Sequence, residues 1–167
     1  VDFMFSNTGS TLPRALAKGD IKDASLFNEK WILFRNDGDF KFTDTAAETK
    51  IADYEFSWGC TFADMNNDGL QDLMVAENYV DLAPNKLFRL PSRFLVQKED
   101  GTFAPTEEKS GVVNPHFAIT SLVSDFNQDG DLDMICVNID SPSLAYINKG
   151  GTNNYLQVDL GESANAQ

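Results

Sequence analysis

The feature that most constrains this chain is an internal repeat. Residues 56–77 align without a gap on residues 117–138, which lie 61 positions further along a sequence of 167 residues. The same shift carries Phe42 onto Phe103, in a separate stretch, so the period belongs to the chain and not to one motif. A period of this length is typical of repeat architectures.

A third, incomplete copy of the repeat begins the sequence. Residues 2–7 resemble residues 133–138 with both ends matched, so that Asp2 takes the place of Asp133. The first half of this copy would then lie upstream of Val1, and we expect the chain to be a processed or excised piece of a longer polypeptide that begins in mid-repeat. We expect repeats over residues 1–45 (truncated), 46–106 and 107–160.

Within each repeat the hydrophobic pattern is that of β-strands. Large and small side chains alternate over residues 56–62 and 117–123, each followed by an acidic stretch. Beyond the acidic stretch, residues 73–76 and 134–137 are continuous apolar runs, as expected of strands covered on both faces. Further strands are expected over residues 31–35, 93–97, 144–148 and 155–160, and a short helix only over 12–18. The predicted fold class is therefore all-β.

The strongest chemical signal is an acidic nonapeptide, Asp-x-Asn-x-Asp-Gly-x-x-Asp, which occurs twice. We call residues 64–72 the first loop and residues 125–133 the second loop. Each loop holds three carboxylates and one amide oxygen within nine residues, which would repel one another without a cation. Ca²⁺ takes about 6–8 oxygen ligands, from the side chains at positions one, three and five and from the backbone carbonyl at position seven. The predicted ligands are Asp64, Asn66, Asp68, the carbonyl of Leu70 and Asp72, and then Asp125, Asn127, Asp129, the carbonyl of Asp131 and Asp133.

Neither an EF-hand nor a magnesium site suits these loops as well. Gly at position six permits the left-handed backbone that turns the chain around an ion. An EF-hand loop closes with Glu at position twelve, where this chain has Val75 and Cys136. Mg²⁺ demands octahedral geometry and retains waters. A single copy could be an ordinary hydrophilic turn, but two copies in register favour two calcium sites, with calcium in a structural role.

Composition excludes several classes of function. The 26 acidic residues outnumber the 13 basic ones and give a net charge of −13, which argues against nucleic acid and anionic membranes as partners. No apolar run approaches the roughly 20 residues that a membrane helix needs. We therefore expect no membrane insertion.

Individual residues that could carry chemistry are expected to have structural roles instead. His116 is the only histidine and has no candidate nucleophile at a motif spacing. Cys60 and Cys136 lie at apolar strand positions and are expected to be buried thiols, not a disulfide. Trp31 and Trp58 lie in strand patterns, where core packing is expected. We predict no catalytic residues and no enzymatic activity in this chain.

These motifs resemble the FG-GAP/VCBS repeat of integrin-like β-propellers, in which a strand leads into a D-x-[DN]-x-D-G-x-x-D calcium loop and then into an apolar strand. Residues 33–43 are similar to the L-x-x-N-x-G-D-G-x-F segment of such repeats, with Phe40 in place of a Gly. Residues 36–40 lack the ninth-position acid and are expected to form a turn. In the next copy, residues 100–103 keep the Gly and lose the Asn. Residues 153–167 resemble the start of the ASPIC/UnbV segment of cartilage acidic protein-like sequences.

The resemblance implies a partial β-propeller of about 2.5 repeats, stapled by two Ca²⁺ ions. It implies a secreted, extracellular or periplasmic protein with a role in adhesion or in protein or glycan binding. Millimolar extracellular calcium suits loops whose dissociation constants are around 10⁻⁴–10⁻³ M. The expected partners are other protein chains, the remaining blades of a parent protein, or a glycan. Two alternatives remain open: a fragment of a propeller-type polysaccharide lyase or hydrolase whose active site lies elsewhere, and a docking subunit of a larger assembly.

Overall fold

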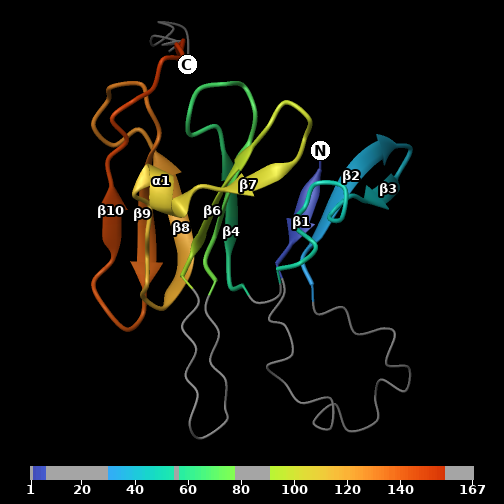
Figure 1. Ribbon diagram of the computed structural model, residues 1–167, viewed down its shortest axis with the longest axis horizontal. Helices are drawn as coiled ribbons and strands as arrows, with labels where there is room; N and C mark the ends of the chain where they lie inside the picture. Colours follow the sequence, from blue (N-terminus) through green and yellow to red (C-terminus); the bar gives the residue numbers. More distant parts are fainter. Residues whose placement is uncertain (1, 7–29, 55–56, 78–90, 157–167) are drawn as a thin grey trace, which may run out of the picture.

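The computed structural model describes residues 2–6, 30–54, 57–77 and 91–156, which form three antiparallel sheets (Figure 1). The first sheet contains β1 (Phe3–Phe5), β2 (Ile32–Gly38) and β3 (Lys41–Asp44). The second contains β4 (Cys60–Ala63), β5 (Asp72–Val75), β6 (Arg93–Gln97) and β7 (Phe103–Pro105). The third contains β8 (Ala118–Ser124), β9 (Asp133–Asn138) and β10 (Leu144–Tyr146). A short helix, α1 (Glu107–Ser110), follows β7. The all-β prediction is confirmed.

The strands predicted before residue 149 are present, with some differences at their ends, and two further strands were not predicted. The strand predicted over 93–97 is β6, whereas the one predicted over 56–62 begins only at Cys60, in β4. The strands β3 and β7 were not predicted, because β3 is exposed throughout with Phe42 as its single apolar residue, and β7 is short and ends in Pro105. Residues 155–156 are not in a strand, and the rest of the strand predicted over 155–160 lies outside the described residues, as does the helix predicted over 12–18.

The helix α1 was also missed, although its sequence carries recognisable signals. Glu107 and Glu108 lie in its first turn, where carboxylates interact favourably with the helix dipole. Gly111 ends the helix in the left-handed conformation, with φ 74°. At four residues, the helix was too short for hydrophobic periodicity to indicate it.

Equivalent strands occupy equivalent places in the three sheets. The second sheet has the order β4-β5-β6-β7, and the third repeats its first three strands while the first repeats its last three. In every sheet an Asp at or just before one strand accepts a hydrogen bond from a backbone N–H in, or just beyond, the following strand. These bonds join Asp2 Oδ1 to Asn36 N (2.8 Å), Asp72 Oδ1 to Gln97 N (3.0 Å) and Asp133 Oδ1 to Asn148 N (2.8 Å). The predicted equivalence of Asp2 with the two later aspartates is confirmed. The sheets fall inside the three expected repeats, whose boundaries stay a prediction.

The second sheet lies between the other two and contributes to a core on each face. One cluster joins it to the first sheet; its buried members are Trp31, Ala46, Ile51, Leu73, Val75, Leu95 and Phe103. The other joins it to the third sheet; its buried members are Ala63, Met65, Met74, Phe94, Met134 and Cys136. Full burial of a side chain such as Leu73 stabilises the fold by about 1.5–3 kcal/mol. Residues 73–76 are all buried, as their continuous apolar run predicted. In the equivalent run of β9, Ile135 and Val137 are only half-buried, so the predicted cover on both faces is wrong there.

The predictions for individual core residues have mixed outcomes. Trp31 is 1% exposed and stacks on Tyr54 with ring centroids 4.6 Å apart, so its predicted core position is confirmed. Trp58 is 49% exposed, and its predicted core position is wrong because β4 begins two residues later. Cys60 and Cys136 are free thiols, as predicted, and burial raises the pKa of both. Cys136 is buried as predicted, whereas Cys60 is half-buried.

Candidate metal sites

The two acidic loops occupy corresponding positions at one end of the molecule (Figure 1). The first loop connects β4 to β5, and the second connects β8 to β9, in each case between paired antiparallel strands. The predicted strand–loop–strand arrangement is therefore confirmed.

Backbone N–H groups hold the oxygens of positions one, three and five inside the first loop. Asp64 accepts from Asp68 N through Oδ1 (3.0 Å) and from Gly69 N through Oδ2 (2.8 Å). Asn66 Oδ1 also accepts from Asp68 N (3.0 Å), and its Nδ2 donates to Asp68 Oδ2 (3.0 Å). Asp68 Oδ1 accepts from Leu70 N (2.8 Å). These bonds fix the three side chains on the inner side of the turn.

The second loop repeats the same five hydrogen bonds at the equivalent positions. Asp125 accepts from Asp129 N (3.1 Å) and from Gly130 N (2.8 Å). Asn127 accepts from Asp129 N (3.0 Å) and donates to Asp129 Oδ2 (2.7 Å). Asp129 Oδ1 accepts from Asp131 N (3.0 Å). The sequence repeat is thus also a repeat of the loop geometry.

Two residues in each loop have a positive φ. At position six, Gly69 has φ +85° and Gly130 has φ +91°, which confirms the predicted role of this glycine. At position four, Asn67 has φ 57° and Gln128 has φ 62°. The second pair was not predicted: Asn tolerates this region, but Gln carries no such signal.

The carboxylates at position nine are fully buried at the base of the loops. Besides the next strand, each binds the backbone of its own loop: Asp72 Oδ2 accepts from Met65 N (3.2 Å), and Asp133 Oδ2 accepts from Phe126 N (3.0 Å). Burial raises the pKa of Asp72 to about 6, although the hydrogen bonds from Gln97 N and Met65 N act in the opposite direction. The charges of the neighbouring loop carboxylates raise this pKa further. A cation in the loop would oppose this repulsion.

The donor set of each loop fits a hard cation. Carboxylate, amide and carbonyl oxygens are the ligands that Ca²⁺ takes. Within the described ranges, however, no three His, Cys, Asp or Glu side chains are grouped closely enough to hold a metal ion. Asp72 and Asp133 accept hydrogen bonds from backbone N–H groups through both of their carboxylate oxygens. The ligand role of the ninth position stays a prediction.

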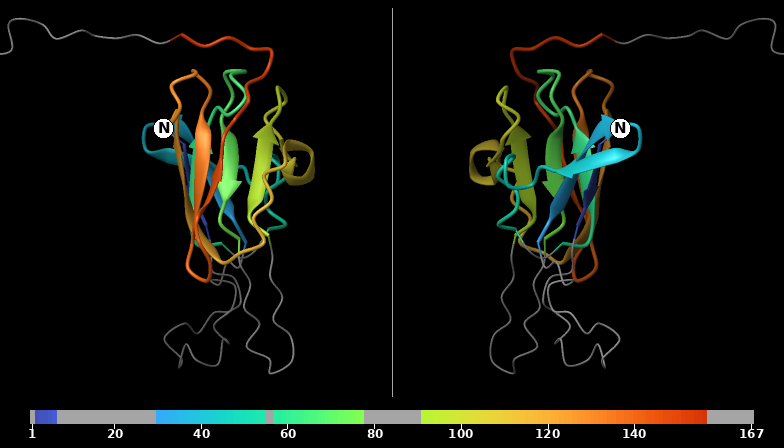
Figure 2. Two further views of the ribbon diagram at one scale, coloured as in Figure 1. Left: turned by 90° about the vertical axis from the view of Figure 1, so that its left-hand side faces the viewer. Right: turned by 90° about the vertical axis from the view of Figure 1, so that its right-hand side faces the viewer.

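Several polar contacts that the sequence did not indicate join the two loops. Asn67 Nδ2 of the first loop donates to Asp131 Oδ1 of the second (2.7 Å). Asn148, just beyond β10, donates through Nδ2 to Met65 O of the first loop (2.7 Å) and to Leu132 O of the second (3.2 Å). The segment after β10 runs along the end of the molecule that carries both loops (Figure 2).

The position of Asn148 does have a sequence signal in retrospect. Gly150 N donates to Asn148 Oδ1 (3.1 Å), as Gly38 N donates to Asn36 Oδ1 (2.9 Å) in the first sheet. Both glycines have positive φ, so Asn-x-Gly forms the same turn after β10 as at the end of β2. Only the fold reveals that the later Asn reaches two loops.

The Asn-Asp-Gly-Asp-Phe stretch ends β2 and forms the turn between β2 and β3 at its last two residues. Its corner residues Asp39 and Phe40 have φ 49° and 58°. Asp37 accepts from Arg35 Nε (2.8 Å) and from Thr43 Oγ1 (2.5 Å), and these two hydrogen bonds lower its pKa. This carboxylate therefore has protein partners.

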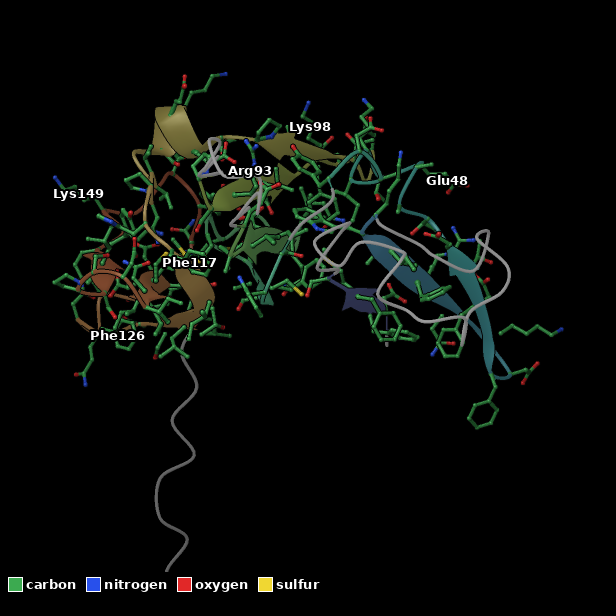
Figure 3. The ribbon with its side chains drawn as sticks, turned by 90° about the horizontal axis from the view of Figure 1, so that it is seen from below. Glu48, Arg93, Lys98, Phe117, Phe126 and Lys149 are labelled. Atoms are coloured by element: carbon green, nitrogen blue, oxygen red, sulfur yellow. The ribbon has the colours of Figure 1, made fainter. Side chains whose placement is uncertain are left out.

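A groove of about 800 Å³ lies between the second and third sheets, beside the first loop. Its lining includes Met65, Phe94, Tyr146 and two lysines, but no Asp, Glu or His among the described residues. The Lys149 side chain extends outward from the third sheet (Figure 3). The groove therefore offers no carboxylate or imidazole pair for acid–base chemistry.

Comparison with known families supports the repeat assignment. Residues 24–75 match the family model of the FG-GAP-like repeat, a range that includes β2 to β5 and the whole first loop. No curated relative matches the chain. The three small antiparallel sheets are consistent with the β-rich fold of FG-GAP-like repeats. Among the described residues, no helix is long and apolar enough to span a membrane.

Proposed function

We propose that this chain is a calcium-binding β-propeller segment of a secreted or surface-exposed protein, extracellular or periplasmic, in which calcium has a structural role. The observation that supports this most is the identical inward arrangement of positions one, three and five in both loops. Two loops at different places in the chain share five hydrogen bonds and two left-handed positions. An incidental hydrophilic turn has no reason to be repeated in such detail.

The position of the loops supports the proposed structural role. Each connects two strands whose side chains contribute to the cores, so an ion in the loop would fix the ends of both strands. With about 1 mM Ca²⁺ and a dissociation constant near 10⁻⁴ M, each site would stabilise the folded state by roughly 1.4 kcal/mol.

Isothermal titration calorimetry with Ca²⁺ tests this function directly. We expect two ions per chain, weaker heats with Mg²⁺, and a melting temperature several degrees lower in excess EGTA than in 1 mM Ca²⁺. Fewer than two bound ions would contradict the site assignment. An unchanged melting temperature in EGTA would contradict the structural role.

The partners proposed for this module are other protein chains, further blades of a longer protein, or a glycan, as in adhesion. The net charge of −13 disfavours nucleic acid. We also propose that residues 153–167 begin an ASPIC/UnbV-like segment; residues 157–167 lie outside the described residues. We assign no catalytic residue and no enzymatic activity.

A further inference from the structure

The amide of Asn148 lies where the two loops and the third sheet meet. Its Nδ2 donates to Met65 O at position two of the first loop and to Leu132 O at position eight of the second. Its backbone N–H donates to Asp133 Oδ1, the ninth-position carboxylate of the second loop (2.8 Å). One residue thus contacts the backbone of both loops and a predicted ligand of one of them.

A second contact joins the loops directly. Asn67 holds a left-handed backbone at position four of the first loop, and its side chain donates to Asp131 at position seven of the second. The predicted ligand at position seven is the backbone carbonyl of Asp131. The side chain of Asp131, a predicted ligand residue of the second loop, is therefore hydrogen-bonded to the first loop.

These contacts give a physical route between the sites. An ion in the first loop would fix the backbone at positions two and four, and with it the groups that bind Asn148 and Asp131. The second loop would then lose less conformational entropy when it binds its own ion. A coupling of this kind acts equally in both directions.

We propose that Asn148, together with Asn67, couples the two calcium loops, so that calcium in either loop strengthens calcium binding in the other. This inference rests on the proposed function. Asn148 is a positioning residue in it, since its side chain binds loop backbone and no ion.

Calorimetry on the full chain measures the coupling. The variants Asp129→Ala and Asp68→Ala each leave one loop intact and give the separate affinity of that loop. We expect the product of the two association constants of the wild-type chain to exceed the product of these separate constants by about tenfold. The same comparison in an Asn148→Ala background should give a factor close to one, and Asn67→Ala should give an intermediate value.

Asn36→Ala is the matched control. Asn36 forms the same Asn-x-Gly turn in the first sheet, but among the described residues it hydrogen-bonds neither loop. We expect it to keep the full coupling factor. Thermal melts in EGTA show whether each variant is folded, and Asn67→Ala provides the test if Asn148→Ala is not folded.

The outcomes are distinguishable. Two independent sites in the wild-type chain, or a coupling factor that survives both Asn148→Ala and Asn67→Ala, would overturn this inference alone. No calcium uptake by the wild-type chain would overturn the proposed function and this inference with it.

Discussion

The two acidic loops have the same internal hydrogen bonds but different surroundings. Both hold positions one, three and five with the same hydrogen bonds, but a Cβ at Gly69 would meet nothing within 4 Å, whereas one at Gly130 would lie 1.7 Å from the Tyr155 ring. The base of the first loop is braced by Gln97, whose Oε1 accepts from Gln71 N (3.1 Å), while the base of the second is braced by Asn148. The nonapeptide determines the loop geometry, and the surrounding residues determine how each loop is supported.

The largest expected effect is the loss of one ion per loop. Asp68→Ala and Asp129→Ala each remove the central carboxylate of one loop, so calorimetry should count one Ca²⁺ ion in each variant and none in the double variant. If Asp68→Ala still bound two ions, the assignment of position five as a ligand would be wrong.

The buried carboxylates at position nine should matter even without calcium. Asp72→Ala leaves the N–H groups of Met65 and Gln97 without their acceptor in the protein interior, at a cost of about 1–3 kcal/mol each. We expect Asp72→Ala and Asp133→Ala to lower the free energy of unfolding in urea by about 2–4 kcal/mol in EGTA. Asp2→Ala, at the exposed equivalent position, should have a smaller effect. Equal effects at all three positions would contradict this account of burial.

Replacing the glycine at position six with valine should destabilise the two loops to different extents. Both positions have positive φ, where a β-branched residue is strained, so Gly69→Val should lower the free energy of unfolding by about 1–3 kcal/mol. Gly130→Val should lower it further, because the new side chain must also displace Tyr155. In a Tyr155→Ala background the two variants should have similar urea midpoints. A difference that persists there must have another origin.

The smallest effect is expected at the β2–β3 turn. Asp37→Ala removes hydrogen bonds to two exposed side chains and should leave the calcium count at two and the melting temperature nearly unchanged. A lost ion in this variant would show that the turn binds metal, contrary to our interpretation.

The sequence predicted the features that depend on short stretches of the chain or on its internal repeat. The resemblance of residues 2–7 to residues 133–138 predicted the equivalence of Asp2 with the later aspartates, and Gly at position six predicted the left-handed backbone of Gly69. Both predictions depend only on short stretches of consecutive residues. The exposed β3 was missed because no apolar pattern marks it. The contact of Asn148 with Met65 could not be predicted, because it joins residues 83 positions apart in the chain.

The strand β5 contributes side chains to both cores of the molecule. Leu73 and Val75 enter the core shared with the first sheet, while Met74 enters the core shared with the third. A slip of β5 by one residue would exchange these sets and spoil both cores at once. The register of β5 is therefore fixed by the packing of both cores. Because β5 contributes side chains to each core, a substitution in one core that shifts this strand also changes the packing of the other.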